Sequence, residues 1–127
     1  MDIIISNFSG EPIYLQIVNQ LKELIIKGIL EESQKLPSIR NLAKELQISV
    51  ITAQRAYDEL EREGFIYTVV GKGSYVASIN KEMYRETKTK IVEEKLSEAI
   101  KHAKQAGLTE KELKDILNHL IEGDKVE

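Results

Sequence analysis

The chain has 127 residues, 42% hydrophobic and 31% charged, with a formal net charge of −3, so it can form one well-packed domain with an extension but not two full-sized domains. It contains no cysteine, which excludes disulfides, thiolate nucleophiles and cysteine-ligated zinc. No apolar run approaches the roughly 20 residues of a membrane span, and the first residues do not resemble a signal peptide, so we expect a cytoplasmic protein with no membrane partner.

Three short helices are predicted in the first half of the chain. Pro12 suits a first helical turn, and apolar residues recur after it at helical spacing until Gly28, a natural C-terminal stop. A second helix over residues 38–46 begins with a serine that can cap it. After a turn of about three residues, Ser49 can cap a third helix that ends at Gly64.

Residues 65–78 change to a strand-forming pattern interrupted by Gly71, Lys72 and Gly73, which predicts a β-hairpin. Three helices followed by a two-stranded wing is the element order of a winged helix-turn-helix. A nucleotide-binding loop requires a glycine, then four residues of any type, then Gly-Lys-Ser/Thr. Ile66 occupies that first position and Gly73 follows Lys72, so we interpret the glycines as the tip of the wing.

The composition shifts after Asn80 to Lys, Glu, Ala, Ile and Leu. This segment predicts a long amphipathic helix that ends at Gly107, followed by a helix that begins with a capping box of Thr109 and Glu112. The apolar positions of the two helices are Ile91, Val92, Leu96, Ala99, Ile100, Ala103, Ala106, Leu113, Ile116, Leu117, Leu120 and Ile121. The predicted fold is therefore α+β and mostly α, with a winged helix-turn-helix domain over residues 1–79 and a helical hairpin over residues 80–127.

Residues 36–76, "LPSIRNLAKELQISVITAQRAYDELEREGFIYTVVGKGSYV", resemble the DNA-binding domain of the GntR family of bacterial transcription regulators. The family pattern Leu-Pro-Ser-x-Arg-x-Leu-Ala, then Ser-x-x-Thr, a Glu-Gly turn and a Gly-x-Gly wing occurs here in order. The short two-helix tail resembles the YtrA subfamily, which lacks large effector domains. The resemblance implies a repressor of its own operon, and often of an operon that encodes an ABC-type transporter.

The candidate DNA-binding residues come from two arguments. In a helix-turn-helix the N-terminal turns of the second helix lie nearest the base edges, and here they carry Val50, Ile51, Thr52, Gln54 and Arg55. The start of the preceding helix places Ser38 and Arg40 for phosphate or base contact. The second argument is the resemblance, which implies that the positions of the family's DNA contacts are Ser38, Arg40, Ser49, Thr52 and Gly71, with Lys72 beside Gly71.

The sequence departs from the family pattern at two contact positions. Many family members have arginine where this chain has Val50, and often where it has Gln54. Gln54 can pair with adenine and Val50 or Ile51 can contact a thymine methyl group, so we expect an operator rich in A·T pairs. For Arg55 two interpretations stay open, a DNA contact and an ordinary exposed helix residue.

The predicted DNA-binding face carries few cations, so one domain alone should bind weakly at physiological salt. These cations are Lys35, Arg40, Lys44, Arg55 and Lys72. Two linked domains on one duplex would bind far more tightly, because the second contact becomes intramolecular. We therefore expect a homodimer, formed through the C-terminal helices, that binds a palindromic double-stranded DNA operator. The alternative is that the apolar face of the tail closes back on the first helix.

No set of residues indicates catalysis, a metal site or a cofactor, so an enzyme is the weakest hypothesis. His102 and His119 lie on different helices of the tail, and no third ligand has diagnostic spacing. A winged-helix module that binds protein without specific DNA binding is the alternative function. The sequence does not identify an effector, but without a further domain one would have to bind in the tail, at the dimer interface or between the tail and the winged domain.

Overall fold

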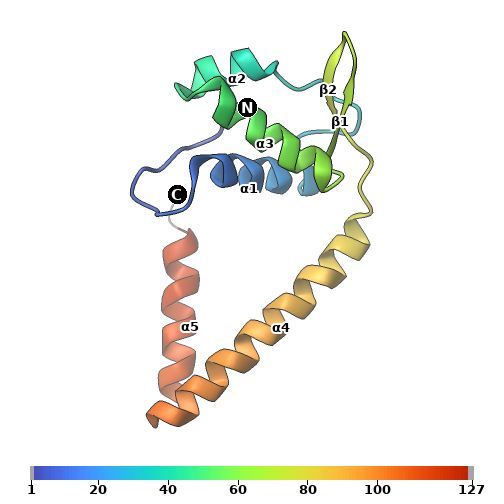
Figure 1. Ribbon diagram of the computed structural model, residues 1–127. Helices are drawn as coiled ribbons and strands as arrows, with labels where there is room; N and C mark the ends of the chain where they lie inside the picture. The colour runs from blue at the N-terminus through green and yellow to red at the C-terminus, as the bar shows by residue number, and fades with distance from the viewer. Residues whose placement is uncertain (1, 126–127) are drawn as a thin grey trace. The chain divides into compact units, whose positions relative to one another are not determined.

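The computed structural model describes residues 2–125 and forms two compact units, one ending at Lys81 and the other beginning at Glu82. The first unit contains α1 (Ile13–Ile26), α2 (Ile39–Leu46), α3 (Val50–Arg62), β1 (Ile66–Val69) and β2 (Gly73–Val76) (Figure 1). The second consists of α4 (Lys81–Ala106), apart from its first residue, and α5 (Glu110–Lys125). Helices with one small antiparallel sheet confirm the predicted α+β, mostly α class.

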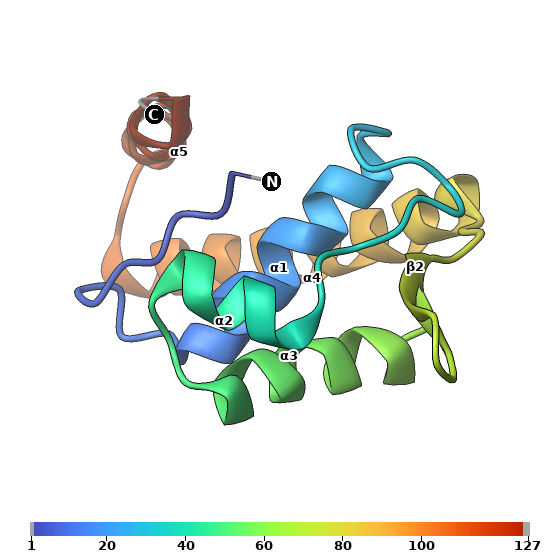
Figure 2. The ribbon, with the colours of Figure 1, turned by 90° about the horizontal axis from the view of Figure 1, so that it is seen from above.

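The core of the first unit forms where α3 packs against both α1 and α2 (Figure 2). Its fully buried aliphatic side chains are Ile17, Val18, Leu21, Leu42, Leu60 and Val76. Those on the helices recur at the three- and four-residue spacing that places side chains on one helical face. Leu42 and Ala43 of α2 are buried, whereas Leu46 at the end of that helix is only half-buried.

The helices begin and end close to the residues predicted to cap them. The Ser38 and Ser49 hydroxyls each accept a hydrogen bond from the backbone amide three residues later, at 3.1 Å. Gly28 and Gly64 follow the ends of α1 and α3 with positive φ angles of 77° and 81°, which glycine adopts without steric strain. Pro12 precedes the first helical residue and does not belong to the first turn, which corrects the expected start of α1 by one position.

The wing is a hairpin in which Ile66 pairs with Val76 and Val69 pairs with Gly73. The stretch before α2, residues 33–36, pairs with the other edge of β2, which the sequence did not indicate. The Leu36 amide donates to the Ser74 carbonyl at 2.9 Å, and the Ser33 amide donates to the Val76 carbonyl at 2.8 Å. The wing is therefore fixed to the segment that leads into α2.

The residues before α1 form an arm held by two glutamine side chains of that helix, a second feature that the sequence did not indicate. The Gln20 carboxamide accepts from the Ile4 amide and donates to the Ile4 carbonyl, at 2.8 and 2.7 Å. The Gln16 carboxamide makes the same pair of bonds with Ser6, both at 2.8 Å, and also donates to the Ser9 hydroxyl and the Glu11 carbonyl. Gln16 is only 6% exposed, and these bonds satisfy its polar atoms.

The second unit is a helical hairpin whose turn has the predicted capping box. The Thr109 amide donates to the Glu112 carboxylate at 3.0 Å, and the Glu112 amide donates to the Thr109 hydroxyl at 3.1 Å. The bond from the Thr109 amide, with a smaller contribution from the Thr109 side chain, lowers the pKa of the Glu112 carboxyl. From this turn α4 and α5 diverge (Figure 1), and among their described side chains Ala103 alone is buried. None of the helices in residues 2–125 combines the length and apolar character needed to cross a bilayer.

Candidate nucleic-acid interface

Helices α2 and α3 and the three residues between them form the helix-turn-helix. The turn is closed by a hydrogen bond from the Ile48 amide to the Ala43 carbonyl at 3.0 Å. Gln47 takes the left-handed conformation there, with a φ angle of 55°, a position more often filled by glycine or asparagine. The buried Tyr57 of α3 donates from its hydroxyl to the Pro37 carbonyl at 2.7 Å. This bond connects α3 to the segment that positions the start of α2.

The Tyr57 hydroxyl acts as a donor at all physiological pH values. Burial of the ring raises the pKa of Tyr57 far above its usual range, and the nearby Glu45 carboxylate raises it further. The neutral phenol is therefore the form present in the folded domain.

The face of α3 opposite the core presents the predicted contact residues at its N-terminal end. Val50 and Ile51 are exposed, Ile51 to 82%, and core packing explains neither apolar side chain. Thr52 is half-buried, and its hydroxyl lies 2.8 Å from that of Ser49. Methyl groups exposed at the start of a recognition helix suit contact with thymine.

Gln54 is exposed but its carboxamide is not free to rotate. Its Nε2 donates to the Asp58 carboxylate, one turn later, at 2.8 Å. Reading adenine requires the carboxamide oxygen and one N–H group. The bond to Asp58 uses one N–H group, so it orients the carboxamide, and the oxygen and the second N–H have no partner among the described residues.

Ser38 and Arg40 lie at the exposed start of α2. The Ser38 oxygen accepts from the Asn41 amide at 3.1 Å, so its own hydroxyl hydrogen stays available for a phosphate oxygen. The Arg40 guanidinium forms no ion pair with any carboxylate in residues 2–125. The N-terminal end of α2 thus presents a donor and an unneutralised cation.

Arg55 points toward α1, where its guanidinium stacks on the ring of Tyr14. The guanidinium carbon lies 3.9 Å from the ring centroid. No sequence pattern predicts this pair, because the two residues are far apart in the chain and nothing in the spacing of either helix relates them. Arg55 is exposed, so both interpretations, a DNA contact and an ordinary exposed helix residue, stay open.

The tip of the wing is a tight turn from Val69 to Lys72, closed by a bond from the Lys72 amide to the Val69 carbonyl at 2.9 Å. Gly71 has a φ angle of 80°, as the third position of a type II turn requires. Lys72 is exposed at this tip, and Val70 is 96% exposed. The glycines therefore set the shape of the tip, and the lysine adds charge to it.

A second lysine extends the basic surface of the wing. A side chain carbon of Lys35 would lie 3.2 Å from a Cβ atom added at Gly73. Lys35 precedes α2 and pairs with Tyr75 of β2, and its ammonium group lies beside Gly73 of the wing. In the part of the chain that the structure describes, no group of three or more His, Asp or Glu side chains is arranged to hold a metal ion.

Comparison with known proteins identifies the fold family of this surface. The sequence profile of the bacterial regulatory proteins of the gntR family matches residues 13–76. The chain belongs to the GntR family. The matched segment contains the helix-turn-helix, both strands of the wing and every candidate contact residue.

The relatives of this GntR-family protein are transcription regulators. The HTH-type transcriptional repressor YtrA of Bacillus subtilis (strain 168) is 43% identical over 79% of this chain and 77% of its own length. The solved structure of YtrA from Sulfolobus acidocaldarius, a GntR-family transcription factor, is 40% identical, with a TM-score of 0.63 over 75% of this chain and 97% of that one. The chain is therefore a transcription regulator with a DNA-binding helix-turn-helix and not an enzyme.

A third structure relates the domain to DNA. AraR(DBD), solved in complex with the operator ORX1, is 28% identical, with a TM-score of 0.51 over 61% of this chain and 92% of that one. Regulators of the GntR type bind operator DNA. This membership favours the DNA-binding hypothesis over the winged-helix module that binds only protein.

Proposed function

We propose that this GntR-family regulator is a homodimeric repressor that binds a palindromic operator through the start of α3 and the wing of each subunit. The observation that carries the homodimer is the apolar surface of the tail. The contact residues are supported by the exposed hydroxyl and cation at the start of α2 and by the exposed methyl groups and carboxamide at the start of α3.

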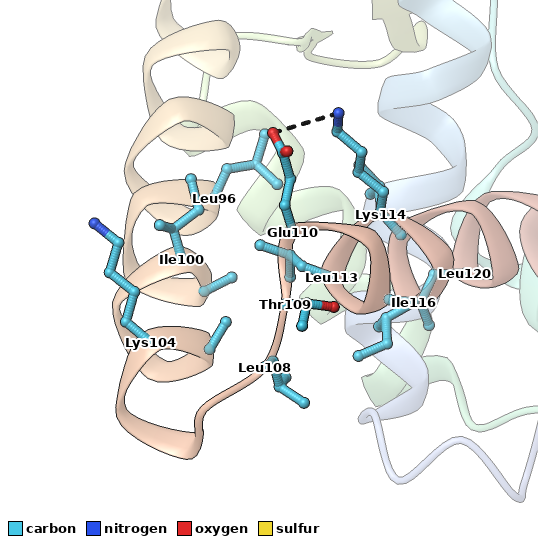
Figure 3. Close-up of a pocket in the computed structure, with 13 residues that line it drawn as sticks. Leu96, Ile100, Lys104, Leu108, Thr109, Glu110, Leu113, Lys114, Ile116 and Leu120 are labelled. Atoms are coloured by element: carbon cyan, nitrogen blue, oxygen red, sulfur yellow. Dashed lines mark ion pairs between the residues drawn. The ribbon is translucent and has the colours of Figure 1, made fainter.

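An apolar groove of about 600 Å³ lies between α4 and α5 where they diverge (Figure 3). Ile100 of α4 and Leu120 of α5 line it, and they are 45% and 61% exposed. The other aliphatic side chains along the groove are Leu96, Ala99, Ala103, Leu108, Leu113, Ile116 and Leu117. A continuous apolar surface of this kind marks an interaction site, because soluble monomers rarely leave one uncovered.

We favour a second copy of the chain as the occupant of this groove. Its walls are almost wholly aliphatic, and charges lie at its rim, where Lys114 pairs with Glu110 at 3.4 Å and Lys104 extends from α4 away from α5 (Figure 3). An apolar centre with a charged rim of both signs is typical of protein interfaces. In a two-fold dimer the same face of each subunit meets its counterpart, so a helical hairpin with an open apolar face can complete itself.

The electrostatics of the winged domain also favour a dimer. Only five cations lie near its proposed DNA-binding face, Lys35, Arg40, Lys44, Arg55 and Lys72. Each neutralised phosphate contributes a fixed amount to the salt dependence, so a few contacts give weak binding at physiological salt. Two linked domains raise the effective local concentration for the second half-site by orders of magnitude.

We further propose that the protein acts in the cytoplasm, that it represses its own operon, and that its targets include an operon that encodes an ABC-type transporter. Repression, as opposed to activation, is supported by the Bacillus subtilis relative YtrA, which is a transcriptional repressor. The regulated genes follow from the resemblance to the YtrA subfamily, and binding to the region upstream of the protein's own gene tests them directly.

The dimer is tested by Ile100→Glu, which places a charge in the groove. Gln105→Glu is the matched control, because Gln105 lies on the same helix and does not line the groove. We expect sedimentation equilibrium to show a dimer for the wild type and for Q105E, and a monomer for I100E. A wild type that stays monomeric at all concentrations would support closure of the tail on the winged domain and contradict the proposed interface.

DNA selection with the purified protein tests the operator. We expect the recovered duplexes to contain two inverted half-sites at a fixed spacing near one helical turn. I100E should bind these duplexes more weakly than Q105E, because it loses the linkage between the domains. Recovery of single half-sites, or of no common sequence, would refute the palindromic operator.

A further inference from the structure

Arg55 of α3 and Tyr14 of α1 form a cation–π pair. The Arg55 guanidinium carbon lies 3.9 Å from the centroid of the Tyr14 ring, a stacking distance. Arg55 is an exposed side chain in the second turn of α3, and Tyr14 is half-buried in the first turn of α1. Both residues belong to the same compact unit, so the stack holds a long cationic side chain in one place beside the recognition helix.

The stack leaves the hydrogen-bonding edge of the guanidinium unused. Stacking occupies a face, whereas the five N–H donors of an arginine lie in its plane. Within residues 2–125 Arg55 forms no hydrogen bond or ion pair with a protein group. The acidic residue nearest along the helix, Asp58, accepts a hydrogen bond from Gln54.

The other arginine of α3 shows what a structural cation on this helix looks like. Arg62, at the C-terminal end, bonds the Glu59 carboxylate through Nε at 3.0 Å and through Nη2, and it also lies near Glu63. Its hydrogen bonds to Glu59 lower the pKa of that carboxyl to about 2. Arg62 is therefore neutralised by its own helix, whereas Arg55 is held by an uncharged ring.

We propose that Tyr14 is a positioning residue for DNA binding, which holds the Arg55 guanidinium edge-on toward a backbone phosphate. This proposal rests on the DNA-binding face proposed above and extends it to the first turn of α1. A planar guanidinium suits bidentate contact with two phosphate oxygens. An arginine ordered before binding loses less conformational freedom when it meets the phosphate.

Two substitutions of Tyr14 test the aromatic face of the ring independently of its hydroxyl and of the volume of the side chain. Tyr14→Phe keeps an aromatic face, and Tyr14→Leu keeps an apolar side chain without one. We expect Y14F to bind DNA as the wild type does, and Y14L to bind about 2- to 5-fold more weakly, the range of a modest cation–π interaction. The probes are a duplex recovered by selection with the wild type and a random-sequence duplex of the same length. The loss should be similar on both, because a phosphate contact carries no sequence information.

A double-mutant cycle distinguishes positioning from folding. Arg55→Ala should reduce the slope of log K against log salt by about one for each subunit bound, and Arg62→Ala is the matched control that removes a cation already paired with glutamate. In the R55A background Y14L should cause no further loss. A Y14L loss that persists in this background would assign Tyr14 a structural role and overturn the proposal.

The outcomes separate this proposal from the function on which it rests. A wild type that prefers no sequence refutes specific operator binding, whereas the random duplex still reports the phosphate contact. A wild type that selects an operator, together with an R55A variant of unchanged salt slope, overturns the Arg55 contact alone. A changed sequence preference in R55A would mean that Arg55 reads a base, which also contradicts the proposal.

Discussion

Replacement of Lys72 by alanine tests the role of the wing. Lys72 is exposed at the tip, and its backbone N–H bond to Val69 does not involve the side chain, so the domain should fold normally without the ammonium group. One lost phosphate contact lowers the slope of log K against log salt by about 0.9. Over a fourfold rise in salt, the affinity of the wild type should therefore fall about 3.5-fold more than that of K72A if one contact is lost, and about 12-fold more if a dimer loses two contacts.

The assay is fluorescence anisotropy on a selected operator and on a random duplex, at salt concentrations between about 50 and 200 mM, the range over which phosphate contacts dominate. Lys111→Ala is the control, because it removes the same charge from an exposed position on the tail. We expect K72A to weaken both duplexes by the same factor and K111A to change neither. An altered sequence preference in K72A, with an unchanged salt slope, would show that the wing reads bases and would refute the division between a specifying helix and a positioning wing.

Three further substitutions test other parts of the domain. Gln54→Ala should change the base preferred within each half-site in a repeated DNA selection and leave the salt slope unchanged, since it removes a base-reading carboxamide. Tyr57→Phe removes the bond to the Pro37 carbonyl and should lower the free energy of unfolding by about 1–2 kcal/mol in urea titrations. Because the pKa of Tyr57 is raised in the folded domain, the contribution of this shift to stability is complete below the unfolded pKa of about 10 and is lost as the pH rises above that value. The free energy of unfolding of Tyr57→Phe should therefore decrease less at alkaline pH than that of the wild type. Gly73→Ala should cost about 1–3 kcal/mol in thermal unfolding, because its φ angle of 118° strains any residue with a Cβ atom.

The sequence was sufficient to predict the elements because their ends carry local signals. Ser38 and Ser49 cap the two helices of the helix-turn-helix, and Thr109 with Glu112 forms the expected capping box. Glycines after α1 and α3 mark the ends of those helices. Each of these signals acts over three or four residues, so it can be read without knowledge of the tertiary structure.

Contacts between distant segments could not be predicted in the same way. The pairing of residues 33–36 with β2 uses backbone groups, which carry no sequence pattern. The left-handed Gln47 occupies a position where the glycine signal is missing. The stack of Arg55 on Tyr14 depends on how α1 packs against α3, and helical periodicity indicates only which face of each helix is buried.

The candidate site is a mixture of shown and predicted features. The DNA-binding helix-turn-helix follows from family membership. The individual contacts of Arg40, Thr52, Gln54 and Lys72 stay predictions, and the structure adds the local partners that constrain them. Asp58 orients Gln54 and Ser49 holds the Thr52 hydroxyl, so substitutions at these partners would also move the proposed contact residues.

The arm that Gln16 and Gln20 hold against α1 bears on the choice of a minimal DNA-binding fragment. The family profile begins at residue 13, but the buried Gln16 carboxamide bonds Ser6, Ser9 and Glu11. A fragment cut at residue 13 would remove all three of these partners and expose the Gln16 carboxamide to solvent. A DNA-binding fragment that keeps the arm on α1 therefore starts upstream of the segment that the family profile matches.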